Sequence, residues 1–492
     1  MTSATLSHLD PAQLAERLVA IVGSAGVVSS LQERRTYESD GLPSYRATPG
    51  LVVLPETAAQ VQAVVALCHG ARVPFVARGS GTGLSGGALP LENGVLIALS
   101  RLRRILEVDL PNQRVVVEPG VTNLAVSHAV GGAGFYYAPD PSSQQVCSIG
   151  GNVAENSGGA HCLKYGFTTH HVVGLEVVLP DGSLVHLGGK ALDAPGYDLL
   201  GCFVGSEGTL GIATKITLKI LRRPESVRTL LAPFASTDAA GEAVSGIVAA
   251  GIVPAAVEMM DALAIEAAEA AVGAGYPKDA GAILIVELDG PTAEVEHELS
   301  AVSEICRRAG AREVRLAKDD DERALFWKGR KSAFAAVGRI SPDYYVQDGV
   351  IPRTALPQVL RRIAALSAEA GLRVANVFHA GDGNLHPLVL YDAAIPGQAE
   401  KGELLAMQIL DICLEHGGSV TGEHGIGVDK RAALGKMFTA DDLDVMQRLR
   451  CAFDPDSLCN PGKVFPTPRL CGDRPGPRQA HPIEASGAAT VF

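Results

Sequence analysis

The spacing of apolar and polar residues changes character near residue 222. Upstream of that point, several apolar runs have the length of buried strands. They lie at 51–55, 73–79, 95–99, 114–120, 172–182 and 208–220. Between the first two, residues 56–70 carry their apolar side chains at the period of a helix. This part of the chain is predicted to mix helices and strands.

Downstream of residue 222, longer helical patterns alternate with strand-like runs. Helical spacing is found at 254–272, 293–309, 355–370, 399–416 and 440–452. Strand-like runs lie at 282–290, 312–317, 344–352 and on both sides of Asp382-Gly383. The pattern predicts a second α+β domain followed by a helical C-terminal segment.

Two histidines stand symmetrically about an Asp-Gly dipeptide in VFHAGDGNLHPLVLY, residues 377–391. Asp-Gly is a strong signal for a two-residue type I′ hairpin turn. A hairpin centred on Asp382-Gly383 would set His379 opposite His386, with Cβ atoms roughly 4.5–5.5 Å apart. Both imidazoles could then bind one metal ion. A hydrogen-bonded histidine pair near a strand end is the alternative, and these residues alone leave both open.

Five glycine-rich segments lie in the first half of the chain. They are RGSGTGLSGGALP (78–90), APDPSS (138–143), SIGGNVAENSGG (148–159), KYG (164–166) and GSEGTLG (205–211). The first contains G-x-G-x-x-G, but it leads into a strand, whereas the Rossmann fingerprint must open a helix. Glycine-flanked amides form nests for phosphate groups. Single loops of this kind often serve only as tight turns, and five together favour an extended, phosphate-bearing ligand.

Composition narrows the classes of function. The chain of 492 residues has 42 Lys and Arg against 54 Asp and Glu, a net charge of −12, which argues against nucleic acid or an anionic membrane surface as partner. The apolar stretch at 246–257 is too short to span a bilayer. No basic-then-apolar leader is evident, so a cytoplasmic location is expected. The nine cysteines include no C-x-x-C, so no iron–sulfur ligand run is offered.

Seven segments together resemble the FAD-linked oxidases of the vanillyl-alcohol oxidase type. They are RGSGTGLSGGALPL, YYAPDPSSQ, SIGGNVAENSGGAHCLKYG, GSEGTLG, VFHAGDGNLHPL, GEHGIG and FDPDSLCNPGK. Within that family, the chain is most similar to the flavin-bearing catalytic subunits of bacterial glycolate oxidases. The resemblance covers roughly residues 30–466 in the family's order.

This resemblance implies an α+β fold: a two-part FAD-binding domain of the vanillyl-alcohol oxidase (PCMH) type, an inserted α+β substrate-capping domain and a C-terminal helical return. The boundaries it implies are an N-terminal helical segment (1–48), the FAD-binding domain (49–224), the cap with the hairpin (225–420) and the C-terminal FAD-oxidase segment (421–466). The remaining residues, 467–492, are rich in Pro, Gly and polar residues and are predicted to be disordered.

The resemblance also implies which residues line FAD. They are Arg78, Gly79, Ser80, Gly81, Thr82, Gly83, Pro141, Ser142, Ser143, Gly150, Gly151, Asn152, Asn156, Ser157, Gly158, Gly159, Gly205, Ser206, Glu207, Gly208 and Asn460. Some relatives attach the flavin covalently through a histidine in the first loop. This loop has Ser80 and Thr82 instead, so FAD is expected to be bound non-covalently.

By the same resemblance, His379, His386 and Glu423 hold a divalent metal, expected to be zinc, with His424 as general base. Two imidazoles and a carboxylate with an open position form a catalytic rather than a structural zinc site. Arg330 is expected to bind the substrate carboxylate, with a surface helix charge as the alternative. Relatives that act on 2-hydroxyglutarate carry a lysine near the position of Val346, so a smaller substrate is expected here.

The function implied is FAD-dependent oxidation of a small 2-hydroxy acid, glycolate or D-lactate, to the 2-oxo acid. Electrons would pass to a second flavin-type subunit and an iron–sulfur subunit, which would also provide any contact with the inner membrane. A stand-alone D-lactate dehydrogenase is the main alternative. A non-catalytic flavin relay subunit would not need His379, His386, Glu423 and His424 together, and a zinc hydrolase would not bind a yellow cofactor.

Overall fold

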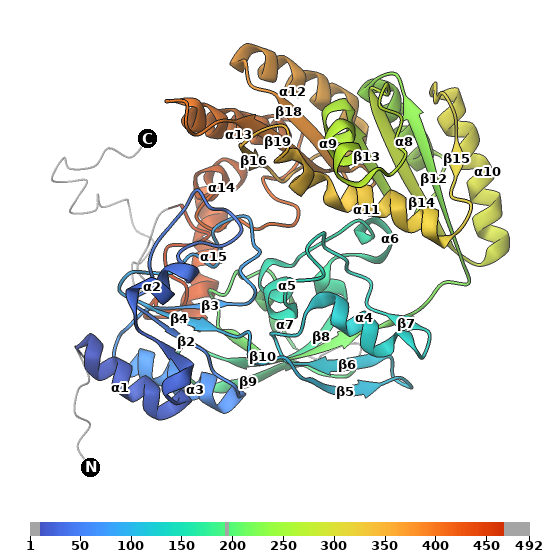
Figure 1. The fold of residues 1–492 in the computed structure, drawn as a ribbon. Helices are drawn as coiled ribbons and strands as arrows, with labels where there is room; N and C mark the ends of the chain where they lie inside the picture. The colour runs from blue at the N-terminus through green and yellow to red at the C-terminus, as the bar shows by residue number, and fades with distance from the viewer. Residues whose placement is uncertain (1–9, 192–195, 467–492) are drawn as a thin grey trace.

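The computed structural model describes residues 10–191 and 196–466, so the tail predicted to be disordered lies outside the described residues. Figure 1 shows two tiers. The glycine-rich first half forms the lower tier, and a large sheet with its helices forms the upper one. The last helices return beside the lower tier.

The lower tier contains two sheets. The first has the order β1-β2-β4-β3, formed by Val27–Val28, Leu51–Val53, Val95–Ala98 and Phe75–Arg78. The second is antiparallel with the order β5-β6-β10-β8-β9, formed by Ile105–Asp109, Arg114–Val117, Ile212–Lys219, Val172–Val178 and Leu184–Gly188. A small third pair joins β7 (Phe135–Tyr136) and β11 (Leu221–Arg222).

Helices of the lower tier follow from local sequence signals. α3 (Ala58–Gly70) begins where the Thr57 hydroxyl accepts a hydrogen bond from the Gln60 amide, which satisfies one of the free N–H groups of the first turn. It packs in one core cluster with α1 (Pro11–Val22) and the strands of the first sheet. The shorter helices are α2 (Leu31–Arg34), α4 (Asn123–Gly131), α5 (Ile149–Glu155), α6 (Cys162–Tyr165) and α7 (Leu199–Phe203).

The upper tier is built on one antiparallel sheet of eight strands with the order β15-β12-β14-β13-β18-β19-β16, with β17 also paired to β19. In chain order, these strands are β12 (Ser226–Phe234), β13 (Ala256–Asp261), β14 (Ala282–Gly290), β15 (Arg315–Leu316), β16 (Asp343–Val346), β17 (Gly349–Val350), β18 (Val374–His379) and β19 (Asn384–Tyr391). The predicted domain boundaries stay predictions.

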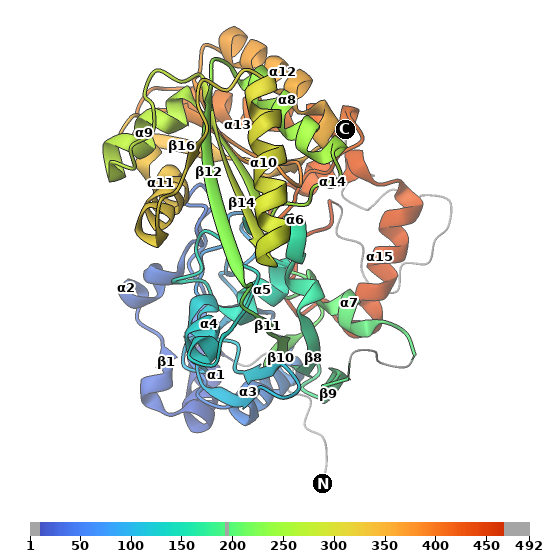
Figure 2. The same ribbon diagram turned by 90° about the vertical axis from the view of Figure 1, so that its right-hand side faces the viewer.

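Helices cover both faces of this sheet. One core cluster joins it to α8 (Thr237–Ala249), α10 (Thr292–Arg308), α12 (Leu356–Ala370) and α13 (Gln398–Glu415). The other joins it to α9 (Ala262–Val272) and α11 (Asp320–Val337). Figure 2 shows these two groups on opposite sides of β12 and β14, and α11 faces the lower tier in Figure 1.

The prediction of one helix over 254–272 is wrong for its first half. Residues 256–261 form the central strand β13, and α9 starts only after Asp261, whose carboxylate accepts a hydrogen bond from the Ala264 amide. A short, continuous apolar run fits a buried strand and a buried helix equally well. Its neighbours β14 and β18 decide the outcome here.

The C-terminal segment returns to the lower tier through α14 (Arg431–Met437) and α15 (Ala440–Phe453). After α15, the Phe75 amide donates to the Leu458 carbonyl and the Asn460 amide donates to the Phe75 carbonyl, so the segment pairs along the edge strand β3. Crossing a membrane would take a longer apolar helix than any of those described.

Candidate active site

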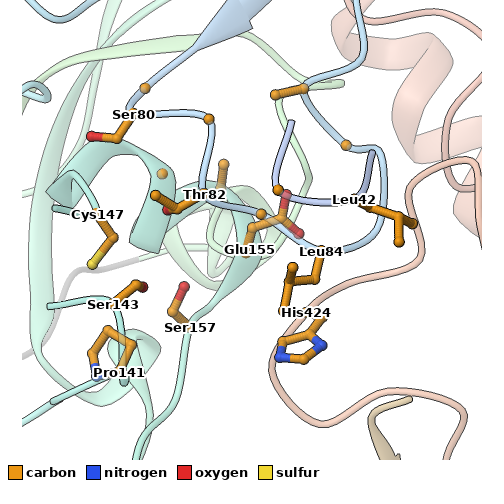
Figure 3. A pocket seen from close by; sticks show the side chains of 18 of the residues that line it. Leu42, Ser80, Thr82, Leu84, Pro141, Ser143, Cys147, Glu155, Ser157 and His424 are labelled. Carbon is orange, nitrogen blue, oxygen red and sulfur yellow. The ribbon is translucent and has the colours of Figure 1, made fainter. Parts of the chain in front are cut away.

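A cavity of about 600 Å³ lies between the two tiers. Glycine-rich loops of the lower tier line one side, and residues of α11, β16, β19 and the 423–424 loop line the other. Figure 3 shows Ser80, Thr82 and Ser143 at this cavity, with His424 on the side away from Ser80. Loops that are far apart in the sequence therefore surround one space.

Most of the residues expected to line FAD do line this cavity. They are Gly79, Ser80, Gly81, Thr82, Gly83, Pro141, Ser142, Ser143, Gly150, Gly151, Asn152, Ser157, Ser206, Glu207 and Gly208. The other expected residues, which do not line it, are Arg78, Asn156, Gly158, Gly159, Gly205 and Asn460.

Two of these non-lining residues fasten the loops from behind. Asn460 Nδ2 donates to the backbone carbonyls of Gly87, at 2.9 Å, and Glu207, at 2.7 Å, so it ties together two loops that line the cavity. Arg78 Nη1 donates to the Ser39 carbonyl at 2.7 Å. Arg78 therefore anchors the N-terminal segment that reaches the cavity at Leu42.

Glycine is required at two points of the lining. Gly81 has a φ of +69°, and a Cβ there would clash with the guanidinium of Arg78. A Cβ at Gly150 would lie 3.0 Å from the Pro119 carbonyl oxygen and 2.6 Å from its Cβ. Both positions keep backbone open to the cavity, as close approach to a large ligand requires.

The sequence-based expectation missed other parts of the lining. They are Gly41–Ser44, Ala77, Leu84, Gly87, Ala88, Leu99, Cys147, Ser148, Val153–Glu155, Phe203, Gly211–Ala213, Lys331, Phe334, Ala335, Pro342–Tyr344, Val346 and Tyr391. Glycine motifs signal a ligand, whereas apolar side chains in a lining have the same pattern as a core. Lys331 alone carried a usable signal, since it stands beside Arg330 in a segment already considered for the substrate.

The hairpin forms, but not in the predicted register. His379 pairs with Asn384 and His386 with Val377, around a four-residue turn at 380–383. A type I′ turn needs positive φ at both central residues, and only Gly383 (φ +85°) has it, while Asp382 accepts a hydrogen bond from the Asn384 amide. Partner numbers shift by two, which keeps every side chain on its predicted face.

The two histidines therefore still meet, as diagonal neighbours. Their ring centroids are 5.1 Å apart. His379 Nε2 lies 3.2 Å from Glu423 Oε1, and His386 Nε2 lies 3.7 Å from Glu423 Oε2. The ligand atoms of all three residues lie within 4.8 Å of one another. This donor set, two imidazoles and one carboxylate, fits a divalent cation such as zinc.

The outer nitrogens of both rings are held by partners. His379 Nδ1 lies 2.7 Å from Glu258 Oε1, and His386 Nδ1 lies 3.3 Å from the Gln347 carbonyl oxygen. Such contacts fix the tautomer and orientation of metal-binding histidines and leave Nε2 free toward the ion. The second contacts expected of a metal site are thus present.

Asp348 organises the loop that carries Glu423 and His424. Its carboxylate accepts hydrogen bonds from the Thr421 hydroxyl at 2.5 Å, from the backbone amides of residues 422–424 at 2.9–3.2 Å, and from Lys430 Nζ at 3.3 Å. Asp348, His386 and His424 also form a metal-compatible group. The lone pairs of Asp348 are already occupied by these donors, so its role is to hold the loop.

His424 faces the cavity from this loop. Its ring stacks on that of His386 with centroids 5.2 Å apart, and its Nδ1 lies 3.9 Å from Asp348 Oδ2. Burial lowers the pKa of His424 below its usual value, although Asp348 acts in the opposite direction. The imidazole is therefore neutral at pH 7 and able to accept a proton.

Arg330 is not the surface charge considered as an alternative, because its side chain is only 2% exposed. Its Nη2 lies 2.6 Å from Glu258 Oε2, and Glu258 in turn contacts His379. Arg330 does not line the cavity. Its binding of a substrate carboxylate stays a prediction.

Comparisons with known proteins decide the family. Residues 49–188 match the model of the FAD binding domain, and residues 223–464 match that of FAD linked oxidases, C-terminal domain. The chain is 55% identical over 437 residues to glycolate oxidase subunit GlcD of Escherichia coli (strain K12), covering 89% of this chain and 88% of that protein. The chain belongs to the FAD-linked oxidases.

Other FAD-linked oxidases extend this similarity. GlcD of Bacillus subtilis (strain 168) is 39% identical, over 92% of this chain and 96% of its own length, and D-lactate dehydrogenase of Anaerostipes hadrus is 33% identical, over 85% and 90%. The fold is also that of p-cresol methylhydroxylase (TM-score 0.77, 16% identity, covering 92% and 96%) and of 4-ethylphenol oxidase from Gulosibacter chungangensis (0.79, 18%, 94% and 98%). The predicted fold is confirmed.

FAD is therefore the cofactor of this FAD-linked oxidase, and the cavity fits it. A cofactor with a pyrophosphate and two ring systems needs a long space lined by backbone, as the glycine loops provide. The lining residues Ser80, Thr82 and Asn152 add hydrogen-bonding side chains.

Proposed function

We propose that this FAD-linked oxidase oxidises a small 2-hydroxy acid, glycolate or D-lactate, to the 2-oxo acid, as the catalytic flavin subunit of a glycolate oxidase. One observation carries the proposal: the cavity lined by the glycine loops also contains His386, Glu423 and His424. A flavin and a metal–base cluster would thus act on the same substrate carbon. The identity to GlcD of Escherichia coli supports glycolate as substrate.

His424 is proposed as the general base. Its Nδ1 faces Asp348, so Nε2 is the nitrogen that accepts the proton of the substrate hydroxyl. A divalent cation held by His379, His386 and Glu423, zinc by its ligand set, supplies the Lewis acidity that lowers the pKa of that hydroxyl. FAD supplies the acceptor for the hydride from Cα. Loss of one proton and one hydride from the hydroxy acid leaves the 2-oxo acid.

The electrons are proposed to leave through partner subunits. The sequence offers no C-x-x-C ligand run for an iron–sulfur cluster. A second flavin-type subunit and an iron–sulfur subunit would supply the onward path. We place the protein in the cytoplasm, with any contact to the inner membrane made by those partners.

A stand-alone D-lactate dehydrogenase is the second candidate. It is favoured by the identity to the D-lactate dehydrogenase of Anaerostipes hadrus. Glycolate and D-lactate differ by one methyl group, so the two candidates are separated by the ranking of substrates and by activity without partners. A relay subunit would have no need of the base His424 in the flavin cavity.

The test compares the FAD-loaded protein with His424→Ala and with His186→Ala, a matched control whose imidazole is 70% exposed on β9. Each is mixed anaerobically with glycolate, and the rate of flavin bleaching is followed. The base role predicts a loss of at least roughly 100-fold for His424→Ala, with FAD content retained, and no change for His186→Ala. Equal rates in all three proteins would contradict it.

A further inference from the structure

One basic side chain faces the cavity. Among the described residues that line it, Lys331 is the only lysine or arginine. Four carboxylates, those of Glu155, Glu207, Asp343 and Glu423, share the lining with it. An anionic substrate entering so acidic a space requires a specific cation.

Lys331 stands between the flavin loops and the metal cluster. It lies on α11 one turn before Phe334, and both side chains line the cavity, as residues three apart share a helix face. The Phe334 ring is 5.6 Å from the His386 ring, centroid to centroid. On the other side, Lys331 Nζ is 3.1 Å from Oδ2 of Asp140, which directly precedes Pro141 of the lining.

Asp140 orients Lys331 without neutralising its surroundings. Asp140 Oδ1 is also 3.0 Å from His161 Nδ1, and His161 Nε2 is 3.0 Å from Glu287 Oε1. Burial opposes the charged imidazole, but Asp140 and Glu287 outweigh it and raise the pKa of His161 to about 10. Lys331 and His161 are therefore two cations that share Asp140.

The second carboxylate is shared as well. Glu287 lies 3.5 Å from Arg323 Nη1 in addition to His161. Three cations thus face the two carboxylates Asp140 and Glu287, which leaves one positive charge unbalanced beside the cavity. Arg330, the neighbour of Lys331, is committed to the buried Glu258. The surplus charge is presented to the cavity through Lys331.

We propose that Lys331 binds the carboxylate of the substrate and thereby selects 2-hydroxy acids over uncharged alcohols. This inference rests on the proposed function, because it concerns the same cavity and the same class of substrate. The ammonium would hold the carboxylate while the adjacent hydroxyl lies toward His424. Lys331 is then a specificity-determining residue contributed by α11.

The test uses Lys331→Met, Lys331→Gln and Lys331→Arg, with Lys328→Met as a matched control, since Lys328 is exposed on the same helix and does not line the cavity. Two dissociation constants are measured on FAD-loaded proteins. One is for glycolate, from the concentration dependence of anaerobic flavin reduction. The other is for oxalate, an unreactive carboxylate, from the perturbation of flavin absorbance.

Loss of a charge-assisted hydrogen bond predicts both dissociation constants to rise roughly 10- to 100-fold in Lys331→Met and Lys331→Gln. The limiting rate of flavin reduction stays within a few-fold of wild type. Lys331→Arg restores most of the affinity, and Lys328→Met changes nothing. Lys331→Gln keeps a hydrogen-bond donor for Asp140, so it serves if Lys331→Met does not fold.

Unchanged dissociation constants in the folded Lys331 variants would overturn the inference. So would an unchanged affinity accompanied by a slower limiting rate and a shifted flavin reduction potential, because Lys331 would then act on the flavin. If no hydroxy acid reduces the flavin of the wild-type protein, the proposed function itself has failed. The oxalate measurement separates that case, since it requires binding and no turnover.

Discussion

Replacing Asp348 with asparagine is expected to destabilise the loop that carries Glu423 and His424. The Asp348 side chain is fully buried, and its carboxylate collects donors from Thr421, from the amides of 422–424 and from Lys430. Burial opposes its ionised form, but the neighbouring cations and the Thr421 hydroxyl hold the pKa of Asp348 far below its usual range. It is therefore charged wherever the protein is folded near neutral pH.

The magnitude follows from Lys430, whose ammonium is only 1% exposed and 3.3 Å from Asp348. Asparagine keeps the shape of Asp348, removes its charge and turns one acceptor into a donor. Removing one partner of a buried ion pair costs about 3–5 kcal/mol because the other charge remains buried. The free energy of unfolding is expected to fall by about that amount in Asp348→Asn.

The assay is a double-mutant cycle on urea unfolding with Asp348→Asn, Lys430→Met and the double variant. Removing both charges leaves no unpaired ammonium, so the double variant should be more stable than the sum of the single effects predicts, by at least roughly 1–3 kcal/mol. Asp320→Asn, at a position 95% exposed, is the control and should change nothing. Additive single effects would refute this account of the loop.

Three further outcomes are expected. The folded pKa of His161, about 10, exceeds its unfolded value of roughly 6.5, so its contribution to stability is complete below pH 6.5 and lost as pH rises through 10; thermal midpoints of His161→Gln should depend less on pH between 7 and 10 than those of wild type, and an identical slope would count against the His161 pairing. Glu258→Gln, which weakens the support of His379, should lower zinc affinity roughly 10- to 100-fold in a chelator competition, whereas unchanged affinity would exclude that role. Gly425→Ala places a Cβ against Glu155 Oε2 at a φ of +79°, so it should cost about 1–3 kcal/mol and reduce FAD content, and full FAD loading would contradict this.

The histidine hairpin illustrates what sequence can predict. Period-two alternation identified both strands and the face shared by His379 and His386, and the structure keeps that face although the turn centre moves by one residue. The turn itself depended on the φ of Asp382, which is set by its hydrogen bond to the Asn384 amide. Local spacing thus specifies the face of a strand more firmly than its register.

Long-range contacts explain the remaining errors. Residues 256–261 are a strand because β14 and β18 flank them, which no local pattern records. The cation facing the cavity is Lys331 rather than Arg330, because one residue of difference rotates a helical side chain by roughly 100° and Glu258, distant in sequence, holds Arg330. Glycine loops were identifiable because their chemistry is local, whereas the apolar lining from Leu42, Phe203 and Tyr391 was not.

The central claim is that the cavity between the two tiers oxidises 2-hydroxy acids. Its most direct test is anaerobic mixing of the FAD-loaded protein with glycolate, D-lactate, L-lactate and D-2-hydroxyglutarate while the flavin absorbance is followed. The account predicts rapid bleaching by glycolate or D-lactate, with the larger D-2-hydroxyglutarate slower. A protein that binds FAD and zinc and is reduced by none of the four would contradict it.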